Sequence, residues 1–291
     1  DPAESAYLPN ICDEDELLTA NAMGSAGWSV SLGIGAGLGG LTISELGVYQ
    51  ALWVDTLTFL VSALIFASLP PGGPEKEEGR ESGFVTALSE IKNGWIHIIE
   101  NSPIRRVVVA KAMWAAGGGA QVFLLILIGM EAGFGSVAAG SIGVLYMARG
   151  FGSGAGPVLG RRLMRSESIR PSLLGLSILT AGLFYLIISF VEWTAIILLL
   201  VFISHGSSGI NWVMSTTLLQ ERTDDEWRGR VAGTDYLLLT GIMGLSALGA
   251  GLVLEEGIFS LRETIALTAM IQIVMGGIWV LFATPSERSM I

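Results

Sequence analysis

The chain has 291 residues, of which 51% are hydrophobic and only 14% charged, with a formal net charge of −10. A soluble domain usually carries about 25% charged residues, so this composition excludes an ordinary soluble globular protein. The single cysteine, Cys12, excludes an intrachain disulfide, and the two distant histidines, His97 and His205, argue against a dedicated zinc site. We therefore expect an integral membrane protein without a metal or other cofactor.

Eight apolar stretches follow the polar and acidic residues 1–16. Each is close to or above the roughly 20 residues that a helix needs to cross a bilayer core. The predicted spans are 17–44, 51–69, 107–130, 136–160, 172–191, 193–219, 236–254 and 264–283. The sequence thus predicts an all-α helix bundle with eight transmembrane helices.

A polar segment separates the second span from the third. Residues 70–83 combine prolines, glycines and charges, which is typical of a linker. Residues 84–99 then place apolar side chains at helical spacing, which predicts an amphipathic helix: Phe84, Leu88, Ile91, Trp95 and Ile98. This helix either lies on the membrane surface or packs onto the protein's own cytoplasmic face, and the sequence leaves both options open.

Basic residues gather on one side of the predicted membrane. With the connections numbered alternately, one side holds every lysine and arginine except Arg262 on the other side and Lys111 and Arg149 inside spans. Cytoplasmic loops carry an excess of basic residues. We therefore expect a multi-pass protein of the cell (inner) membrane, with the basic loops and both ends of the chain in the cytoplasm.

An internal repeat suggests how the spans are grouped. D-E-D-E-L at 13–17 resembles D-D-E-W at 224–227, and G-L-T-I-S-E-L-G-V-Y at 40–49 resembles G-L-V-L-E-E-G-I-F at 251–259. Spans one and two thus match spans seven and eight, but four spans precede the seventh and none precedes the first. Two parallel six-helix repeats are a known transporter plan. The expected division is 1–69 as the end of a first half-bundle truncated at its N-terminus, 70–105 as a cytoplasmic linker, and 106–291 as a complete second half-bundle.

Five segments carry a family resemblance: A-N-A-M (20–23), G-A-G-L-G-G (35–40), A-L-W-V-D-T-L-T-F-L (51–60), A-R-G-F-G-S-G-A-G-P (148–157) and T-L-L-Q-E-R-T-D-D-E-W-R-G-R-V (217–231). In them the chain resembles the major facilitator superfamily, and within it the bacterial drug and siderophore exporter-like branch. The resemblance implies a secondary transporter that exports a small amphipathic molecule by alternating access, with proton exchange. The exporters' G-P-x-x-G-G motif has Ala36 in place of its proline, but Gly35, Gly39 and Gly40 still predict close helix packing.

Ionisable side chains inside spans are costly there, so they are the first candidates for function. Arg149 and His205 lie near the middle of their spans. Arg149 either contacts substrate or a coupling ion, or pairs with an acid such as Asp235. His205 suits proton coupling, but the favoured interpretation is a neutral histidine hydrogen-bonded to a neighbouring helix. Asp55 is expected to bond backbone or a hydroxyl, and Lys111 to be structural.

The resemblance adds two further groups of candidates. The third and sixth spans line the central cavity in this superfamily, so substrate contact, or core packing, is expected of Trp114, Gln121, Asn211 and Trp212. A cytoplasmic gate of charge pairs, or alternatively a solvated basic loop, is expected of Arg161, Arg162, Asp224, Arg228, Arg230 and Asp235.

Other functions lack the residues that they need. Residues 35–40 match G-x-G-x-x-G, but a dinucleotide site requires a preceding strand, and this motif lies inside a span. No catalytic constellation, phosphate-binding lysine or nucleic-acid-binding patch is present, so we expect no enzyme. The expected partners are the lipid bilayer, a small-molecule substrate and protons, with the protein a monomer. A non-transporting scaffold or inactive fragment, and an importer, remain alternatives.

Overall fold

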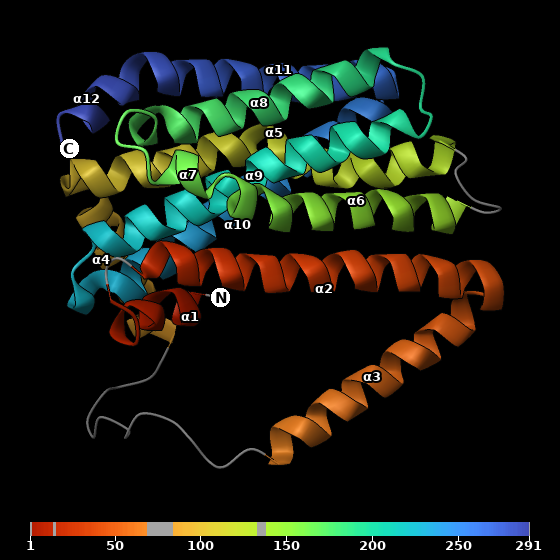
Figure 1. Ribbon diagram of the computed structural model, residues 1–291, viewed down its shortest axis with the longest axis horizontal. Coiled ribbons are helices and arrows are strands. Elements are labelled where there is room, and N and C mark those ends of the chain that lie inside the picture. Colours follow the sequence, from red (N-terminus) through yellow and green to blue (C-terminus); the bar gives the residue numbers. More distant parts are fainter. Residues whose placement is uncertain (1, 14–15, 69–83, 133–137, 291) are drawn as a thin grey trace.

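The computed structural model describes residues 2–13, 16–68, 84–132 and 138–290, which form helices joined by short turns and contain no strand. Figure 1 shows most of them as a bundle of long helices. In chain order these are α1 (Pro2–Tyr7) with a 3-10 turn (Leu8–Asn10), α2 (Leu17–Leu46), α3 (Val48–Ser68), α4 (Phe84–Glu100), α5 (Ser102–Ala132), α6 (Ala138–Leu159), α7 (Arg161–Met164), α8 (Arg170–Phe190), α9 (Ile196–Arg222), α10 (Asp225–Glu255), α11 (Leu261–Ile278) with a π turn (Trp279–Ala283), and α12 (Thr284–Arg288). The predicted linker at 70–83 lies outside the described residues.

Seven stretches of the described helices are long and apolar enough to cross a membrane: α2, α3, α5, α8, α9, α10 and the run Leu261–Arg288. The other expected span corresponds to α6, which packs inside the bundle but is not among these seven. Its glycines and Arg149 lower its mean hydropathy, because these residues contribute little or nothing apolar. The count of eight membrane-spanning helices therefore stays a prediction.

Helix α6 packs between α2 and α9, and its glycines line both contacts. A Cβ on Gly150 would lie 2.6 Å from the backbone nitrogen of Gly33 in α2. On the α9 side, a Cβ on Gly156 would overlap the carbonyl oxygen of Gly206. Small residues let helix backbones approach this closely, so the glycine content of the chain is explained by helix contacts.

The α2 face of this contact differs from the expected glycine motif. Gly40 lies at the contact, where an added Cβ would be 2.8 Å from the carbonyl oxygen of Ala139. A Cβ added to Gly35 or Gly39 would meet no other helix within 4 Å in the described part of the chain, whereas a Cβ on Gly33 would lie 3.4 Å from the carbonyl oxygen of Met147 in α6. Residues three, four or seven apart share one face of a helix, so Gly33 and Gly40 point the same way and the other two do not.

Close packing at Gly156 gives a direct prediction. We expect Gly156→Ala to lower the free energy of unfolding by about 1–3 kcal/mol, because the added methyl group forces α6 and α9 apart. Gly241→Ala on α10 is the matched control, since its Cβ would meet nothing within 4 Å. Thermal unfolding of the detergent-purified protein measures both variants. Equal stability of the two would contradict the close approach of these helices.

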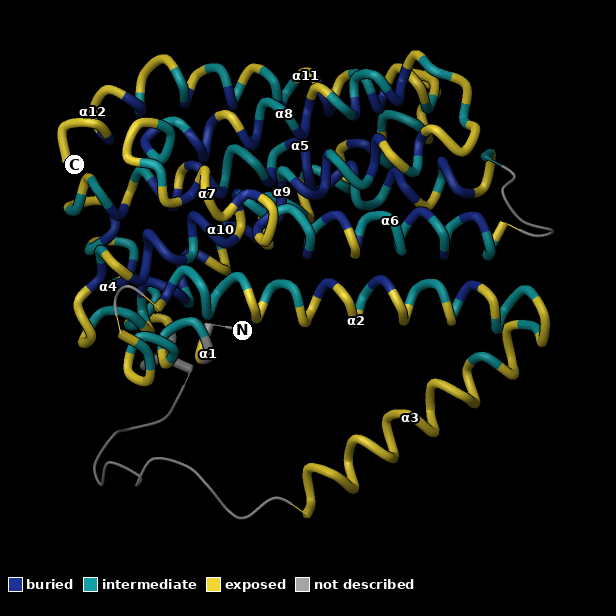
Figure 2. Tube along the Cα trace, viewed as in Figure 1, coloured by how far each residue is buried: buried dark blue, intermediate teal, exposed yellow. Residues whose placement is uncertain are grey.

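Helix α3 leaves the bundle after a sharp turn at Gly47, whose φ of 91° lies in the left-handed region that favours glycine. None of its described residues is buried, and Figure 2 shows it exposed along its length. Its exposed side chains include Trp53 and Phe59. An apolar surface of this extent is suited to contact with lipid chains or with other helices.

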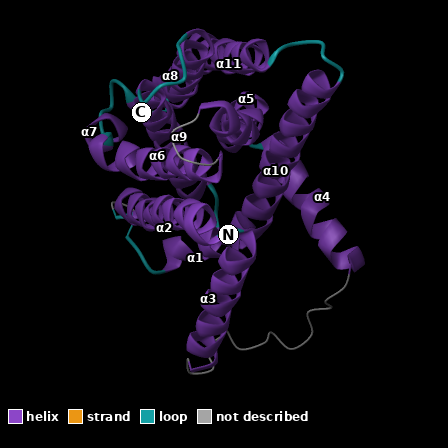
Figure 3. Ribbon diagram, turned by 90° about the vertical axis from the view of Figure 1, so that its right-hand side faces the viewer, coloured by secondary structure: helices purple, strands orange, loops and turns teal. Residues whose placement is uncertain are grey.

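Helix α4 packs onto the bundle beside α10, as the turned view in Figure 3 shows. Gly94 allows the close approach, because a Cβ there would lie 2.8 Å from the carbonyl oxygen of Arg230. Ile98 is buried, and the His97 ring stacks on Trp227 with 4.3 Å between ring centroids. Of the two options for this amphipathic helix, the structure thus shows packing onto the protein itself.

Candidate functional site

Arg149 occupies the middle of α6, without an acidic partner in the described part of the chain. Its guanidinium carbon lies 5.4 Å from the centroid of the Tyr146 ring, one helical turn before it. Its Nε is buried and has no hydrogen-bond partner. The Tyr146 hydroxyl donates to the carbonyl of Val122 in α5 at 2.8 Å. The ring is thereby held in place beside the cation.

Two further side chains join Arg149 from the neighbouring helices. Tyr185 of α8 and His205 of α9 are both buried, and the Tyr185 hydroxyl is hydrogen-bonded to His205 Nε2 at 2.9 Å. Gly152 of α6 packs on the backbone of Phe202 of α9, so Arg149 and His205 each lie within about one helical turn of this contact. We call Tyr146, Arg149, Tyr185 and His205 the arginine cluster. The bond between α8 and α9 is the contact that the favoured interpretation of His205 expects.

Asp235 does not pair with Arg149. Lys111 Nζ donates to Asp235 Oδ2 at 2.7 Å, and both side chains are almost fully buried. The Lys111 ammonium also lies 5.6 Å from the ring centroid of Trp212, which joins α9 to this pair. The second carboxylate oxygen, Oδ1, is buried without a partner. The α5–α10 contact thus brings together two charges that sequence spacing keeps apart.

The other expected cavity residues fall into different environments. Asn211 points into the bundle, where its amide donates to the Leu174 carbonyl at 3.2 Å and to Ser177 Oγ at 3.1 Å. Trp114 Nε1 donates to Ser208 Oγ at 3.1 Å. Gln121 is buried, and its amide nitrogen has no hydrogen-bond partner. Of these three, only Gln121 keeps a buried donor for another group.

Asp55 is exposed on α3, the helix that leaves the bundle in Figure 1. Its backbone carbonyl accepts a hydrogen bond from the Thr58 hydroxyl at 2.7 Å. Its carboxylate makes no hydrogen bond or ion pair with the described residues. The expected bond between this carboxylate and backbone or a hydroxyl is therefore not formed there.

Asp235 is buried beside Lys111, away from the first turn of α10, and the other expected gate residues belong to α7 and the start of α10. The end of the bundle that holds α4, α7, α12 and the first turn of α10 is called the basic end (Figure 1). Arg228 pairs with Asp225 at 3.0 Å, and Arg230 pairs with Glu90 of α4. Asp224 is the N-cap residue of α10, without a side-chain cap bond. Arg228 and Arg230 thus take part in charge pairs, with acids one turn earlier in α10 and from α4, whereas Asp224 forms no ion pair with the described residues. That these residues act as a gate stays a prediction.

Several polar contacts at the basic end join the N-terminal segment to the later helices. Asn21 of α2 donates to Gln220 Oε1 at 2.5 Å and to Thr217 Oγ1 at 3.1 Å on α9. Arg161 Nη2 donates to Thr19 Oγ1 at 3.4 Å. Arg228 Nη1 also donates to Asn10 Oδ1 at 2.9 Å, whereas Arg162 is exposed. These bonds connect residues 10–21 to α7, α9 and α10.

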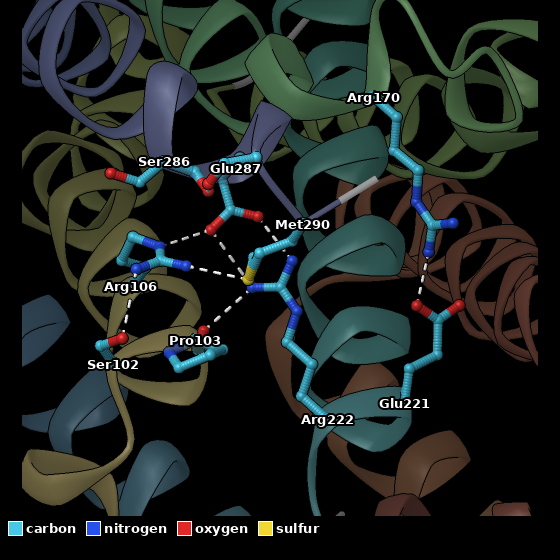
Figure 4. A network of polar contacts seen from close by, with 10 residues as sticks. Ser102, Pro103, Arg106, Arg170, Glu221, Arg222, Ser286, Glu287 and Met290 are labelled. Carbon is cyan, nitrogen blue, oxygen red and sulfur yellow. Dashed lines mark hydrogen bonds and ion pairs between the residues drawn. The ribbon is translucent and has the colours of Figure 1, made fainter.

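Figure 4 shows a second charge network at the basic end, centred on Glu287 of α12. Its carboxylate accepts from Arg106 Nε at 2.6 Å and from Arg222 Nη2 at 2.5 Å. Arg222 also donates to the carbonyl of Pro103 at 2.9 Å. One buried carboxylate thus joins the C-terminal helix to the start of α5 and the end of α9.

The family model described as Major Facilitator Superfamily matches residues 1–247. The chain belongs to the major facilitator superfamily. This match covers α1 through most of α10, so it includes α2 and α3 as well as the helices around the arginine cluster. A search of curated proteins finds no match to the chain. Membership indicates a membrane transporter rather than an enzyme, in agreement with the apolar helices of the described structure.

The sequence analysis did not predict that Tyr146 and Tyr185 belong to the arginine cluster. Tyr146 could have been found, because it stands three residues before Arg149 and therefore on the same helix face. Tyr185 could not, because only the packing of α8 against α9 brings it to His205. Glu287 was also missed, since a single acid near the C-terminus resembles any solvated residue until its two arginines are known.

Proposed function

We propose that this protein is a secondary transporter that exports a small amphipathic molecule by alternating access, in exchange for protons. The observation that carries this proposal is the arginine cluster, which places a cation with an unpaired N–H inside an apolar bundle. Ionisable groups at such depth are expensive and mark substrate or ion pathways. Superfamily membership supports transport, and the cluster supplies a place where substrate or protons act.

Under this proposal the basic end faces the cytoplasm, because loops on that side of a cell membrane carry the excess of Lys and Arg. Residues 1–69 belong to one half-bundle and residues 106–291 to the other, with 70–105 connecting them. The contact of α2 with α6 and α9 is then the boundary between the halves. The bonds from Asn21 to Gln220 and Thr217 close the cytoplasmic gate and break when it opens.

Transport is tested with the protein expressed from its complete reading frame and reconstituted as a monomer in proteoliposomes. A pH gradient is imposed, and a trapped pH-sensitive dye reports proton movement when amphipathic aromatic acids, amides or amines are added. We expect at least one of these probes to move against protons. If none of the probes causes proton movement, a non-transporting scaffold is favoured. If protons and probe move in the same direction, an importer is favoured.

Arg149→Ala is expected to reduce this proton-coupled flux at least about tenfold, since the loss of one charge-assisted hydrogen bond weakens binding by that order. Arg288→Ala is the matched control. Arg288 is exposed on α12, and its loss removes the same charge from the protein. The flux of both variants is compared at equal protein density. Equal flux in Arg149→Ala and wild type would remove the arginine cluster from the transport pathway.

A further inference from the structure

We infer that the substrate of the arginine cluster is an organic anion whose carboxylate is bound by Arg149. This inference rests on the proposed transport function and specifies its substrate class. It starts from the missing countercharge: Arg149 forms no hydrogen bond or ion pair with the described residues, although its Nε is buried. The residue as a whole keeps intermediate exposure, so the side chain remains within reach of a ligand.

The acids of the neighbouring helices are too far along their axes to neutralise Arg149. Helix α6 carries no acid, and within the described ranges its neighbours α2, α5 and α9 carry Glu45, Glu131 and Glu221 near their ends. Gly33 of α2 contacts Gly150, so Glu45 lies about 12 residues, or roughly 18 Å, further along the helix. Similarly, Val122 of α5 contacts Tyr146, and Glu131 lies about 9 residues, or roughly 14 Å, beyond it.

Lys111, another buried cation among the described residues, does have an acidic partner. Lys111 is buried against Asp235 at 2.7 Å. A buried charge without a partner is destabilising, because the interior does not replace the water that the charge loses. Arg149, near the middle of its helix, therefore destabilises the ligand-free protein. A countercharge supplied by a bound ligand would account for a cation that the protein leaves unpaired.

Two features near Tyr146 also favour an anion over a cation. Gln121 of α5 has a buried amide donor without a partner, on the helix turn that the Tyr146 hydroxyl contacts through Val122. A guanidinium binds a carboxylate through two parallel N–H···O bonds, a geometry that neutral and cationic groups cannot match. The Tyr146 ring beside the guanidinium provides an apolar surface for the body of the ligand.

The binding test uses the complete detergent-purified protein with three probes of similar shape: 1-naphthoate, 1-naphthamide and 1-naphthylmethylamine. Octanoate and octanamide repeat the comparison with an aliphatic body. We expect the two carboxylates to raise the melting temperature, and the amides and the amine to leave it unchanged at equal concentration. Stabilisation by the amides equal to that by the carboxylates, or no stabilisation by either carboxylate, would overturn the inference.

Variants of Arg149 provide the second part of the test. Arg149→Gln is expected to weaken 1-naphthoate binding about 10- to 100-fold, as the loss of a hydrogen bond between charged groups does. Arg149→Lys keeps the charge without the fork and should retain part of the affinity. Arg288→Gln, which removes an exposed arginine, should bind as wild type. Unchanged binding in Arg149→Gln would place the anion elsewhere.

Stability without ligand separates a binding role from a structural one. If Arg149 is kept for an anion, ligand-free Arg149→Gln melts at or above the wild-type temperature, because the unpaired charge is gone. If Arg149 supports the fold, both Arg149→Gln and Arg149→Lys melt clearly lower, and the inference fails. The transport proposal is tested separately. Proton-coupled flux of amides or amines only would support the transport function and contradict the inferred anionic substrate. Arg149-dependent binding of naphthoate without any flux would support the anion site and contradict the transport function.

Discussion

Lys111→Met is expected to lower the free energy of unfolding by about 3–5 kcal/mol, the cost of breaking a buried ion pair by removing one partner. The side chains of Lys111 and Asp235 are 7% and 4% exposed, and Asp235 Oδ1 already lacks a hydrogen-bond partner. Without the ammonium, both carboxylate oxygens would lie between α5 and α10 with no countercharge. Thermal unfolding in detergent, with and without the substitution, measures the loss.

A double-mutant cycle decides whether the pair itself is the cause. Lys111→Met combined with Asp235→Leu removes both charges, and replacing a buried pair by apolar residues is often nearly neutral. We therefore expect the double variant to recover most of the lost stability. Lys92→Met, on the exposed side of α4, should change stability little. A double variant as unstable as the sum of the single ones would show that Lys111 and Asp235 act independently.

Glu287→Ala is expected to lower the free energy of unfolding by about 2–3 kcal/mol, because Arg106 and Arg222 lose their common acceptor. Glu287 is 5% exposed, whereas Arg106 and Arg222 keep 21% and 17% exposure, so solvent compensates part of the loss. The effect should also be local. Since Glu287 ties α12 to α5 and α9, amide hydrogen exchange should accelerate in α12 and in the first turn of α5 more than elsewhere.

The matched control is Glu256→Ala, which removes an exposed glutamate from the turn after α10. It should leave both the melting temperature and the exchange of α12 unchanged. Arg106→Ala and Arg222→Ala should each lose part of what Glu287→Ala loses, since the carboxylate keeps one arginine in either variant. Unchanged exchange in α12 of the Glu287 variant would show that other contacts hold the C-terminal helix.

The long apolar helices followed from the sequence because hydropathy and length are local properties. The run from Leu17 predicted α2, and the break at residues 45–50 predicted the turn that Gly47 makes before α3. The family followed from short segments that the match over residues 1–247 includes. Helix α6 shows the limit of hydropathy: its glycines make it less apolar, although they are the reason that it packs so closely against α2 and α9.

The arginine cluster was half predicted. Arg149 and His205 stood out because charged or titratable groups are rare within apolar stretches. Tyr185, the hydrogen-bond partner of His205, became visible only when α8 packed against α9. That no acid of the described residues pairs with Arg149 also follows from the tertiary structure, because the packing of α5 on α10 pairs Asp235 with Lys111 instead.

The sequence by itself determined the class of protein, most of its helices and its superfamily, because these depend on residues close together in the chain. Only the tertiary structure decided which charges meet. The charge pairs join distant parts of the chain: Lys111 with Asp235, Arg230 with Glu90, and Glu287 with its two arginines. Such pairs form where helix packing brings two side chains within about 3 Å of each other, and a local sequence pattern does not predict which distant side chains meet.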